Sequence, residues 1–118
     1  MQLSSPVLAQ DGVKAELVSA LQEALKSEKD DVARLYLAKG VTKLTPDNKE
    51  AAQELVKGFL SKNETTNAEA NTILGEIIQL GPPALVRALL PLLKHENEVI
   101  RRQTADLLAK VDPKAMSR

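Results

Sequence analysis

Few side chains of this sequence could do chemistry, and His95 and the carboxylates Asp30 and Asp31 are the first to consider. His95 is the only histidine and there is no cysteine, so a metal site beside Glu96 would have to be built almost wholly from carboxylates. We interpret His95 as a solvated turn residue. Asp30 and Asp31 stand where a helix is expected to begin, and there they suit capping and the positive helix end better than a general acid–base pair.

The remaining requirements of an active site are also unmet. The five glycines are scattered and never precede a basic residue in a cluster, so no phosphate-binding loop is predicted. Serine and threonine hydroxyls have no second histidine to activate them as nucleophiles. We therefore expect a non-enzymatic protein with no catalytic residue, no cofactor and no bound metal.

Composition indicates one all-α domain. The chain has 118 residues, and 16 Lys and Arg balance 16 Asp and Glu, so no strong overall field favours nucleic acid or an anionic membrane. The longest apolar run, residues 88–93, is interrupted by Pro91 and is far shorter than the ~20 residues that span a bilayer. Tyr36 and Phe59 are the only aromatic residues, which fits a helical core of Leu, Ile, Val and Ala.

Residues 1–10 are expected to be a disordered leader. They have the small-residue composition of a signal-peptide cleavage region, but neither a basic segment nor a long apolar segment comes before it. This predicts a cytoplasmic protein. The alternative is a secreted or periplasmic protein in which residues 1–10 are the remnant of a signal peptide.

Apolar residues at three-four spacing predict three helices in the first half of the chain. Asp11 is expected to cap the first helix and Asp30 to begin the second. Thr45 and Pro46 are expected to be the N-cap and first residue of the third, because the missing N–H of proline costs nothing there. The predicted ranges are 12–26, about 30–43 and about 45–61.

The second half predicts three more helices. Thr66 and Glu69 have the spacing of a capping box and are expected to open the fourth helix. Gly81 is expected to end it in the left-handed conformation, and the Pro82-Pro83 pair then makes a tight corner before the fifth helix.

Two further signals divide the C-terminal third. Pro91 falls inside the fifth helix, where it should remove one backbone hydrogen bond and kink the helix. Asn97 is expected to cap the sixth helix, which Asp112-Pro113 ends. Residues 114–118 are expected to be a frayed tail.

The six helices form an internal repeat. Leu17 aligns with Leu85 and Val32 with Val99, and the middle pair fits between them at a spacing of about 34–36 residues. The pattern predicts a short right-handed α-solenoid of three helix pairs in one domain, residues 11–113. An irregular six-helix bundle of similar composition is the alternative. The expected repeats are 11–44, 45–80 and 81–113.

The third pair carries a recognisable motif. Pro91, the turn 94–98, and then Arg101 followed by Thr104 and Leu108 resemble the HEAT repeat, and the resemblance is clearest over residues 68–118. It implies a HEAT-like fold for the whole chain, with armadillo-like packing as a close neighbour. The first two pairs depart from the motif, since neither has a proline at the position of Pro91, although Arg34 occupies the position of Arg101.

In HEAT-like stacks the second helix of each pair lines the inner curve, so the resemblance implies a binding surface there. We call the outward side of these second helices the second-helix surface. It is predicted to be a mildly basic polar groove with two apolar anchors, suited to an acidic peptide or protein, against the alternative of an ordinary solvated face. Positions four residues apart form a row along each of these helices, and the middle row is Asn71, Gly75 and Gln79. The candidate partner-binding residues are Leu35, Tyr36, Lys39, Lys43, Asn71, Gln79, Arg102, Asp106 and Lys110.

These patterns predict a protein–protein interaction or scaffolding module. The alternatives are a nucleic-acid-binding HEAT-like protein and a segment of a larger HEAT-repeat protein, including a lyase-like one. Charge neutrality and the lack of aromatic stacking residues count against nucleic acid. The lyase-like alternative rests on fold analogy alone.

Overall fold

Short turns join helices throughout the computed structural model, which describes residues 6–116 and contains no strand within that range. The all-α prediction is confirmed. The α-helices are α1 (Pro6–Ser27), α2 (Asp31–Leu44), α3 (Lys49–Phe59), α4 (Glu64–Ile77), α5 (Pro83–Leu89), α6 (Glu98–Ala109) and α7 (Pro113–Met116), with 3-10 helices η1 (Ile78–Leu80) and η2 (Leu90–Lys94).

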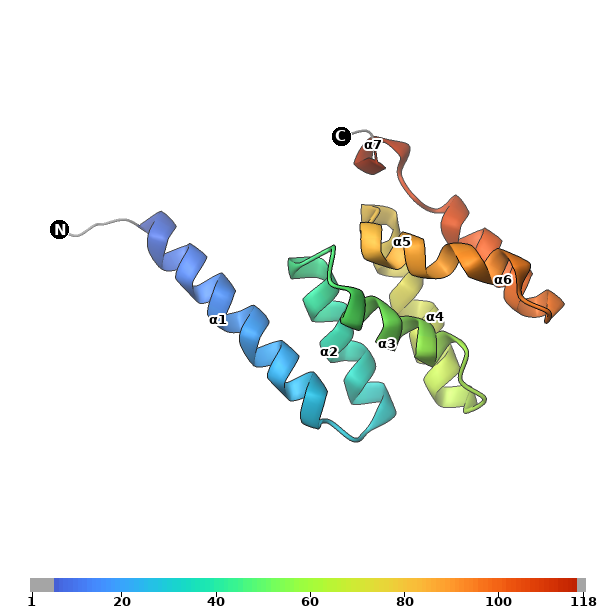
Figure 1. The fold of residues 1–118 in the computed structure, drawn as a ribbon, viewed down its shortest axis with the longest axis horizontal. Coiled ribbons are helices and arrows are strands. Elements are labelled where there is room, and N and C mark those ends of the chain that lie inside the picture. Colours follow the sequence, from blue (N-terminus) through green and yellow to red (C-terminus); the bar gives the residue numbers. More distant parts are fainter. Residues whose placement is uncertain (1–5, 117–118) are drawn as a thin grey trace.

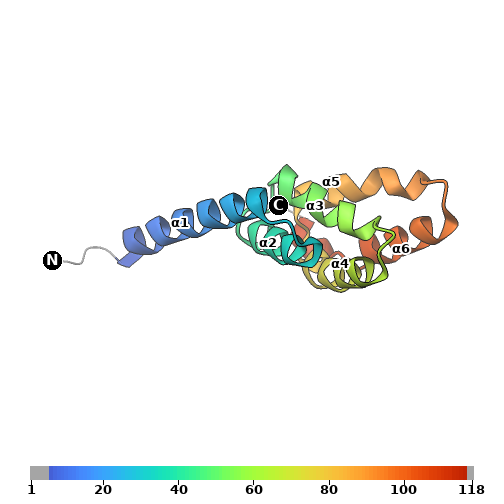
Figure 2. The same ribbon diagram turned by 90° about the horizontal axis from the view of Figure 1, so that it is seen from below.

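The helices lie in two layers. Helices α1, α3 and α5 form one layer and α2, α4 and α6 the other (Figures 1 and 2). Helix α2 packs on α1, α3 and α4, while α3 also packs on α5, and η2 packs on α6. The result is a flat, elongated body of 60 × 37 × 18 Å.

Side-chain caps start α2, α3, α4 and α6, and two of them are as predicted. The carboxylate of Asp30 accepts a hydrogen bond from the Ala33 backbone N–H at 2.8 Å and so caps α2. The amide oxygen of Asn97 accepts one from the Val99 N–H at 2.8 Å and caps α6. Both caps satisfy backbone donors that have no partner inside the helix.

Thr45 does not begin α3 as predicted. Its N–H donates to the Val41 carbonyl and ends α2, so the chain must turn before a new helix can start. Asn48 closes that turn by donating its N–H to the Thr45 carbonyl at 3.0 Å, and its side chain accepts from the Ala51 N–H at 2.8 Å. Asparagine caps helices as well as threonine does, so the cap lies three residues later than expected.

The predicted capping box of Thr66 and Glu69 is also absent. Asn63 caps α4 by accepting a hydrogen bond from the Thr66 N–H at 3.0 Å. Thr66 is therefore in the first turn of the helix, where its side chain is buried. The Glu69 carboxylate instead accepts a hydrogen bond from the Tyr36 hydroxyl at 2.7 Å.

Both ends of the chain are more helical than predicted. Helix α1 begins at Pro6, so Asp11 lies within it and is not its N-cap. A further helical turn, α7, covers part of the expected tail. The rest of the predicted leader, residues 1–5, and residues 117–118 of the tail lie outside the described residues.

The first half of α1 extends beyond the core (Figure 1). Val13 and Leu17 have the three-four spacing of a packed helix face, yet both are exposed. Leu25, near the other end of α1, is buried. Among the residues of α1 whose side chains the structure describes, packing is therefore concentrated in the C-terminal part.

The tight corner after α4 is confirmed. Gly81 has φ 65° and ψ 43°, a left-handed conformation that suits glycine because it has no Cβ. Pro83 is the first residue of α5, and the Ala84 N–H donates to the Pro46 carbonyl at 3.3 Å. Near Pro91 the α-helix gives way to the tighter 3-10 turns of η2.

The core lies between the two layers and is formed mainly by α2 to α5. Leu60, Leu90 and Leu93, although apolar and spaced as the other core leucines are, are exposed. No described helix is long and apolar enough to cross a membrane. The largest fully buried side chains are Phe59, Leu35, Leu55, Ile73, Leu74, Ile77, Ile78, Leu85, Leu89, Val41 and Thr104.

Candidate binding surface

Leu35, predicted as an apolar anchor of the second-helix surface, belongs to the core. Its side chain is only 2% exposed. A Cβ added to Gly58 of α3 would lie 2.5 Å from the Leu35 Cδ2 atom, which shows how closely the two helices approach here. Leu35 was placed on the surface because it lies four residues before Lys39 on the same row of α2. However, both α3 and α4 pack against α2, so more of its circumference is buried than the repeat alignment assumed.

Tyr36 is on the surface as predicted, and side chains of α2 and α4 hold it in place. It is 50% exposed, and its hydroxyl hydrogen-bonds to Glu69 of α4. That bond raises the pKa of Tyr36. The Lys39 ammonium lies 5.8 Å from the ring centroid and donates to Glu76 of α4 at 2.8 Å, which lowers the pKa of Glu76. Two polar contacts therefore join α2 to α4 across this surface.

On α6 the predicted residues pair within their own helix. Arg102 lies 3.6 Å from Glu98, and Lys110 lies 3.6 Å from Asp106. The Lys110 ammonium is also 3.7 Å from the position of a Cβ on Gly75, so that glycine leaves room for lysine to reach over α4. The candidate residues of α6 therefore lie beside those of α4.

The two predicted amides, Asn71 of α4 and Gln79 of η1, make local hydrogen bonds. The Asn71 side chain donates to the Asn67 carbonyl at 2.9 Å, and the Gln79 side chain donates to the Gly75 carbonyl at 3.1 Å. The Gln79 backbone carbonyl accepts a hydrogen bond from the Asp112 N–H at 3.3 Å. Asn71 is half-buried, whereas Gln79 is exposed at the end of the row.

The second-helix surface is more nearly neutral than predicted. Lys39, Arg102 and Lys110 each pair with a carboxylate of the same surface. Lys43 is exposed, and no carboxylate of the described chain lies within 4.0 Å of its ammonium. Lys43 is therefore the predicted cation of this surface that forms no ion pair among the described residues, although its charge also helps to lower the pKa of Glu76.

A metal site is not formed by the described residues, which contain no group of three or more His, Cys, Asp or Glu side chains suitably placed. His95 lies in the turn before α6, where its Nδ1 atom accepts a hydrogen bond from the Asn97 N–H at 3.0 Å. The imidazole thus helps to shape the turn that Asn97 caps.

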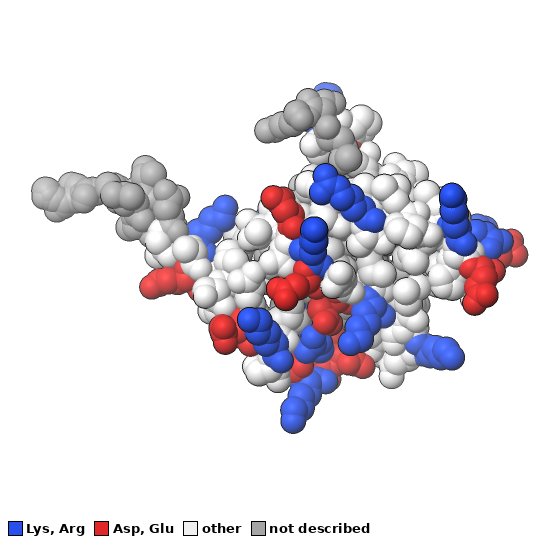
Figure 3. All heavy atoms as spheres, viewed as in Figure 1, with Lys and Arg blue, Asp and Glu red and all other residues white. Residues whose placement is uncertain are grey.

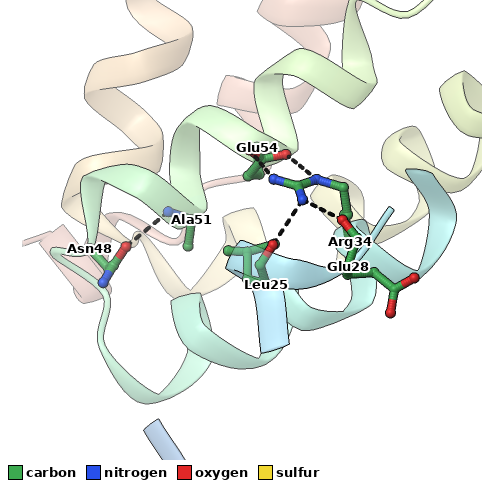
Figure 4. Close-up of polar contacts among 6 residues, drawn as sticks. All are labelled: Leu25, Glu28, Arg34, Asn48, Ala51 and Glu54. Atoms are coloured by element: carbon green, nitrogen blue, oxygen red, sulfur yellow. Dashed lines mark hydrogen bonds and ion pairs between the residues drawn. The ribbon is translucent and has the colours of Figure 1, made fainter. Parts of the chain in front are cut away.

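Sequence reasoning missed the main polar cluster of the fold, which is centred on Arg34 (Figure 4). Its guanidinium donates to the Leu25 and Glu28 carbonyls at 2.8 and 2.6 Å and to both carboxylate oxygens of Glu54. The hydrogen bonds from Arg34 lower the pKa of Glu54. The polar residue types were visible, but nothing in their spacing linked Glu54 of α3 to Arg34 of α2.

Arg101 plays a related part in the third helix pair. Its guanidinium donates to the His95 and Glu96 carbonyls at 2.6 and 3.1 Å. Arg34 and Arg101, which the sequence alignment placed at equivalent positions, therefore both donate to the turn that precedes their own helix, Arg34 to the Glu28 carbonyl and Arg101 to those of His95 and Glu96. In the middle pair the Asn67 side chain donates to the Phe59 carbonyl at 2.7 Å.

Two pockets of about 220 and 230 Å³ flank the Arg34–Glu54 pair. Asp31 and Lys57 line the first, and Gln22 and Lys26 line the second. All three guanidinium nitrogens of Arg34 are engaged within the fold. We therefore assign the cluster a structural role.

Comparisons of the chain with protein families, with curated proteins and with solved structures found no match.

Proposed function

We propose that the three helix pairs form a short HEAT-like α-solenoid that acts as a non-enzymatic protein-binding module. The two layers, with first helices in one and second helices in the other, support this arrangement. The related roles of Arg34 and Arg101 at the turns of the first and third pairs also support a repeat.

The observation that carries the binding proposal is the half-exposed Tyr36 ring on the second-helix surface. Tyrosine contributes large contact area with little conformational freedom to lose, and it is enriched among residues that dominate binding energy. The ring is held by Glu69 and by the ammonium of Lys39. Lys43, one helical turn further along α2, is exposed and has no carboxylate within 4.0 Å among the described residues.

We infer that the partner is a protein or peptide with a carboxylate beside an apolar or aromatic side chain. The apolar part packs on Tyr36 and the carboxylate pairs with Lys43. A nucleic acid is a poorer fit, because the other cations of this surface already pair with carboxylates.

Selection from a displayed random-peptide library tests the proposal. The selected peptides should be acidic, and the double variant Y36A/K43E should bind them at least about tenfold more weakly than the wild type. Lys14→Glu, an exposed charge change on α1, is the matched control and should leave binding unchanged. Equal binding by Y36A/K43E and wild type would remove the second-helix surface from consideration.

A further inference from the structure

The opposite layer contains an uncovered apolar groove between α3 and α5. Val56 and Leu60 of α3 and Ala88 of α5 form its apolar part, and Gln53 and Lys57 complete an open hollow of about 590 Å³. Figure 3 shows this side of the molecule, with a largely uncharged area between α3 and α5. We call this hollow the α3–α5 groove.

The groove exists because the helices packed on α3 do not cover the whole of its apolar face. Val56 packs against the core, but Leu60 is 39% exposed although its position continues the same face. Leu60 is the C-cap of α3, and its N–H donates to the Val56 carbonyl at 2.9 Å. Its backbone is therefore fixed while its side chain remains available for contact with another molecule.

One exposed cation lines the groove, and a second is next in sequence to a lining residue. Lys57 lines it on α3, and Arg87 precedes Ala88 on α5. Both are exposed, and within the described chain neither has a carboxylate closer than 4.0 Å. The segment 83–94 contains Arg87 and Lys94 but no acidic residue. This contrasts with the second-helix surface, where most cations are paired.

We propose that the α3–α5 groove is a second docking surface that binds an acidic amphipathic helix of a partner protein. Aliphatic side chains of that helix pack on Val56, Leu60 and Ala88, as in other helix-in-groove complexes. Its carboxylates pair with Lys57 and Arg87, neither of which forms an ion pair within 4.0 Å in the described part of the chain. This surface lies on the other layer from Tyr36, so it extends the proposed function and does not depend on it.

A designed peptide tests the docking surface directly. The probe is a synthetic helical peptide with leucines at i, i+3, i+4 and i+7 on one face and glutamates on the other. Titrated into 15N-labelled full-length protein, it should cause saturable shifts of the amide resonances of residues 56, 60 and 88. A peptide with lysine in place of every glutamate should bind at least about tenfold more weakly.

Variants separate this surface from the second-helix surface. The double variant K57E/R87E should weaken the leucine–glutamate peptide at least about tenfold, and L60S should weaken it while the protein keeps its helical circular dichroism. Y36A/K43E should bind the peptide as the wild type does.

Several results would overturn the proposal. They are the absence of saturable shifts, shifts centred on α2, α4 and α6, or equal affinity for the glutamate and lysine peptides. Binding of wild-type protein to phosphatidylglycerol vesicles that K57E/R87E abolishes, without peptide binding, would identify a membrane surface and would likewise overturn it.

Discussion

Arg34 and Glu54 form a two-pronged ion pair between α2 and α3, with N–O distances of 2.7 and 3.1 Å. The remaining guanidinium nitrogen donates to carbonyls at the end of α1 and in the turn that follows it. A single side chain thus joins α1, α2 and α3. Planar guanidinium groups suit this geometry, because they present several donors in a fixed arrangement.

Replacing Arg34 with alanine should therefore lower the free energy of unfolding by about 2 kcal/mol, since it leaves the half-buried Glu54 and two carbonyls without their partner. Urea denaturation followed by circular dichroism measures the effect. Arg34→Lys should recover only part of the loss, because an ammonium cannot make the two-pronged contact. Arg102→Ala removes an exposed pair and should change stability by less than about 0.5 kcal/mol. Equal effects of R34A and R102A would contradict this role.

Low pH should reduce the free energy of unfolding, because Glu54 then becomes protonated. The folded-state pKa of Glu54 lies below the ordinary value of 4.5, chiefly because of the Arg34 hydrogen bonds. The unfolded chain therefore takes up its proton first as pH falls. The contribution of Glu54 is present above about pH 5 and is lost as pH falls from there through the lowered folded pKa. Urea midpoints between pH 7 and pH 3 should fall less steeply for Glu54→Gln than for the wild type.

Gly58→Ala should destabilise the protein by about 1–3 kcal/mol, although alanine is the better helix former. The added Cβ would meet the Leu35 Cδ2 atom at 2.5 Å and the Ala70 Cβ at 3.2 Å. Gly12→Ala is the matched control, because nothing lies within 4 Å of its Cβ position on α1. Thermal melts should show a lower midpoint for G58A and an unchanged or higher one for G12A. A higher midpoint for G58A would show that Leu35 can move aside at no cost.

Thr42→Val should stabilise the protein by about 1 kcal/mol, since an unpaired buried hydroxyl costs that much or more. Thr42 is 3% exposed, and its hydroxyl oxygen has no hydrogen-bond partner among the described residues. Valine has a similar shape and a similar helix propensity. Thr72→Val is the comparison, because that exposed hydroxyl donates to the Ala68 carbonyl at 3.1 Å. A rise in the urea midpoint for T42V alone is the expected result.

Local chemistry in the sequence predicted the helices well but not where all of them begin. Asp30, Asn97 and Gly81 act as expected, because each serves its own backbone within three residues. Thr45 and Thr66 had equally good spacing, but Asn48 and Asn63 took the caps. Several residues able to cap stood close together in both places, and the length of the preceding helix decided between them.

The candidate surface was harder to predict, because it depends on contacts between helices. Periodicity placed Tyr36 outside correctly, yet it also placed Leu35 outside, since the covering of α2 by both α3 and α4 cannot be counted from one helix. The pairing of Lys39 with Glu76 joins residues far apart in the chain. Counting the Lys and Arg residues of this surface therefore overestimated its positive charge.

The packing of each helix on its neighbours in the chain also favours fast folding. Helices pack chiefly on neighbours one or two places along the chain, so most contacts close short loops. The entropy lost in closing such loops is small, and proteins with mainly local contacts fold quickly. Structure that nucleates at α2 and α3, which Arg34 and Glu54 join, could spread outward in both directions. The overhanging half of α1 would then be the last part to become ordered and the first to open.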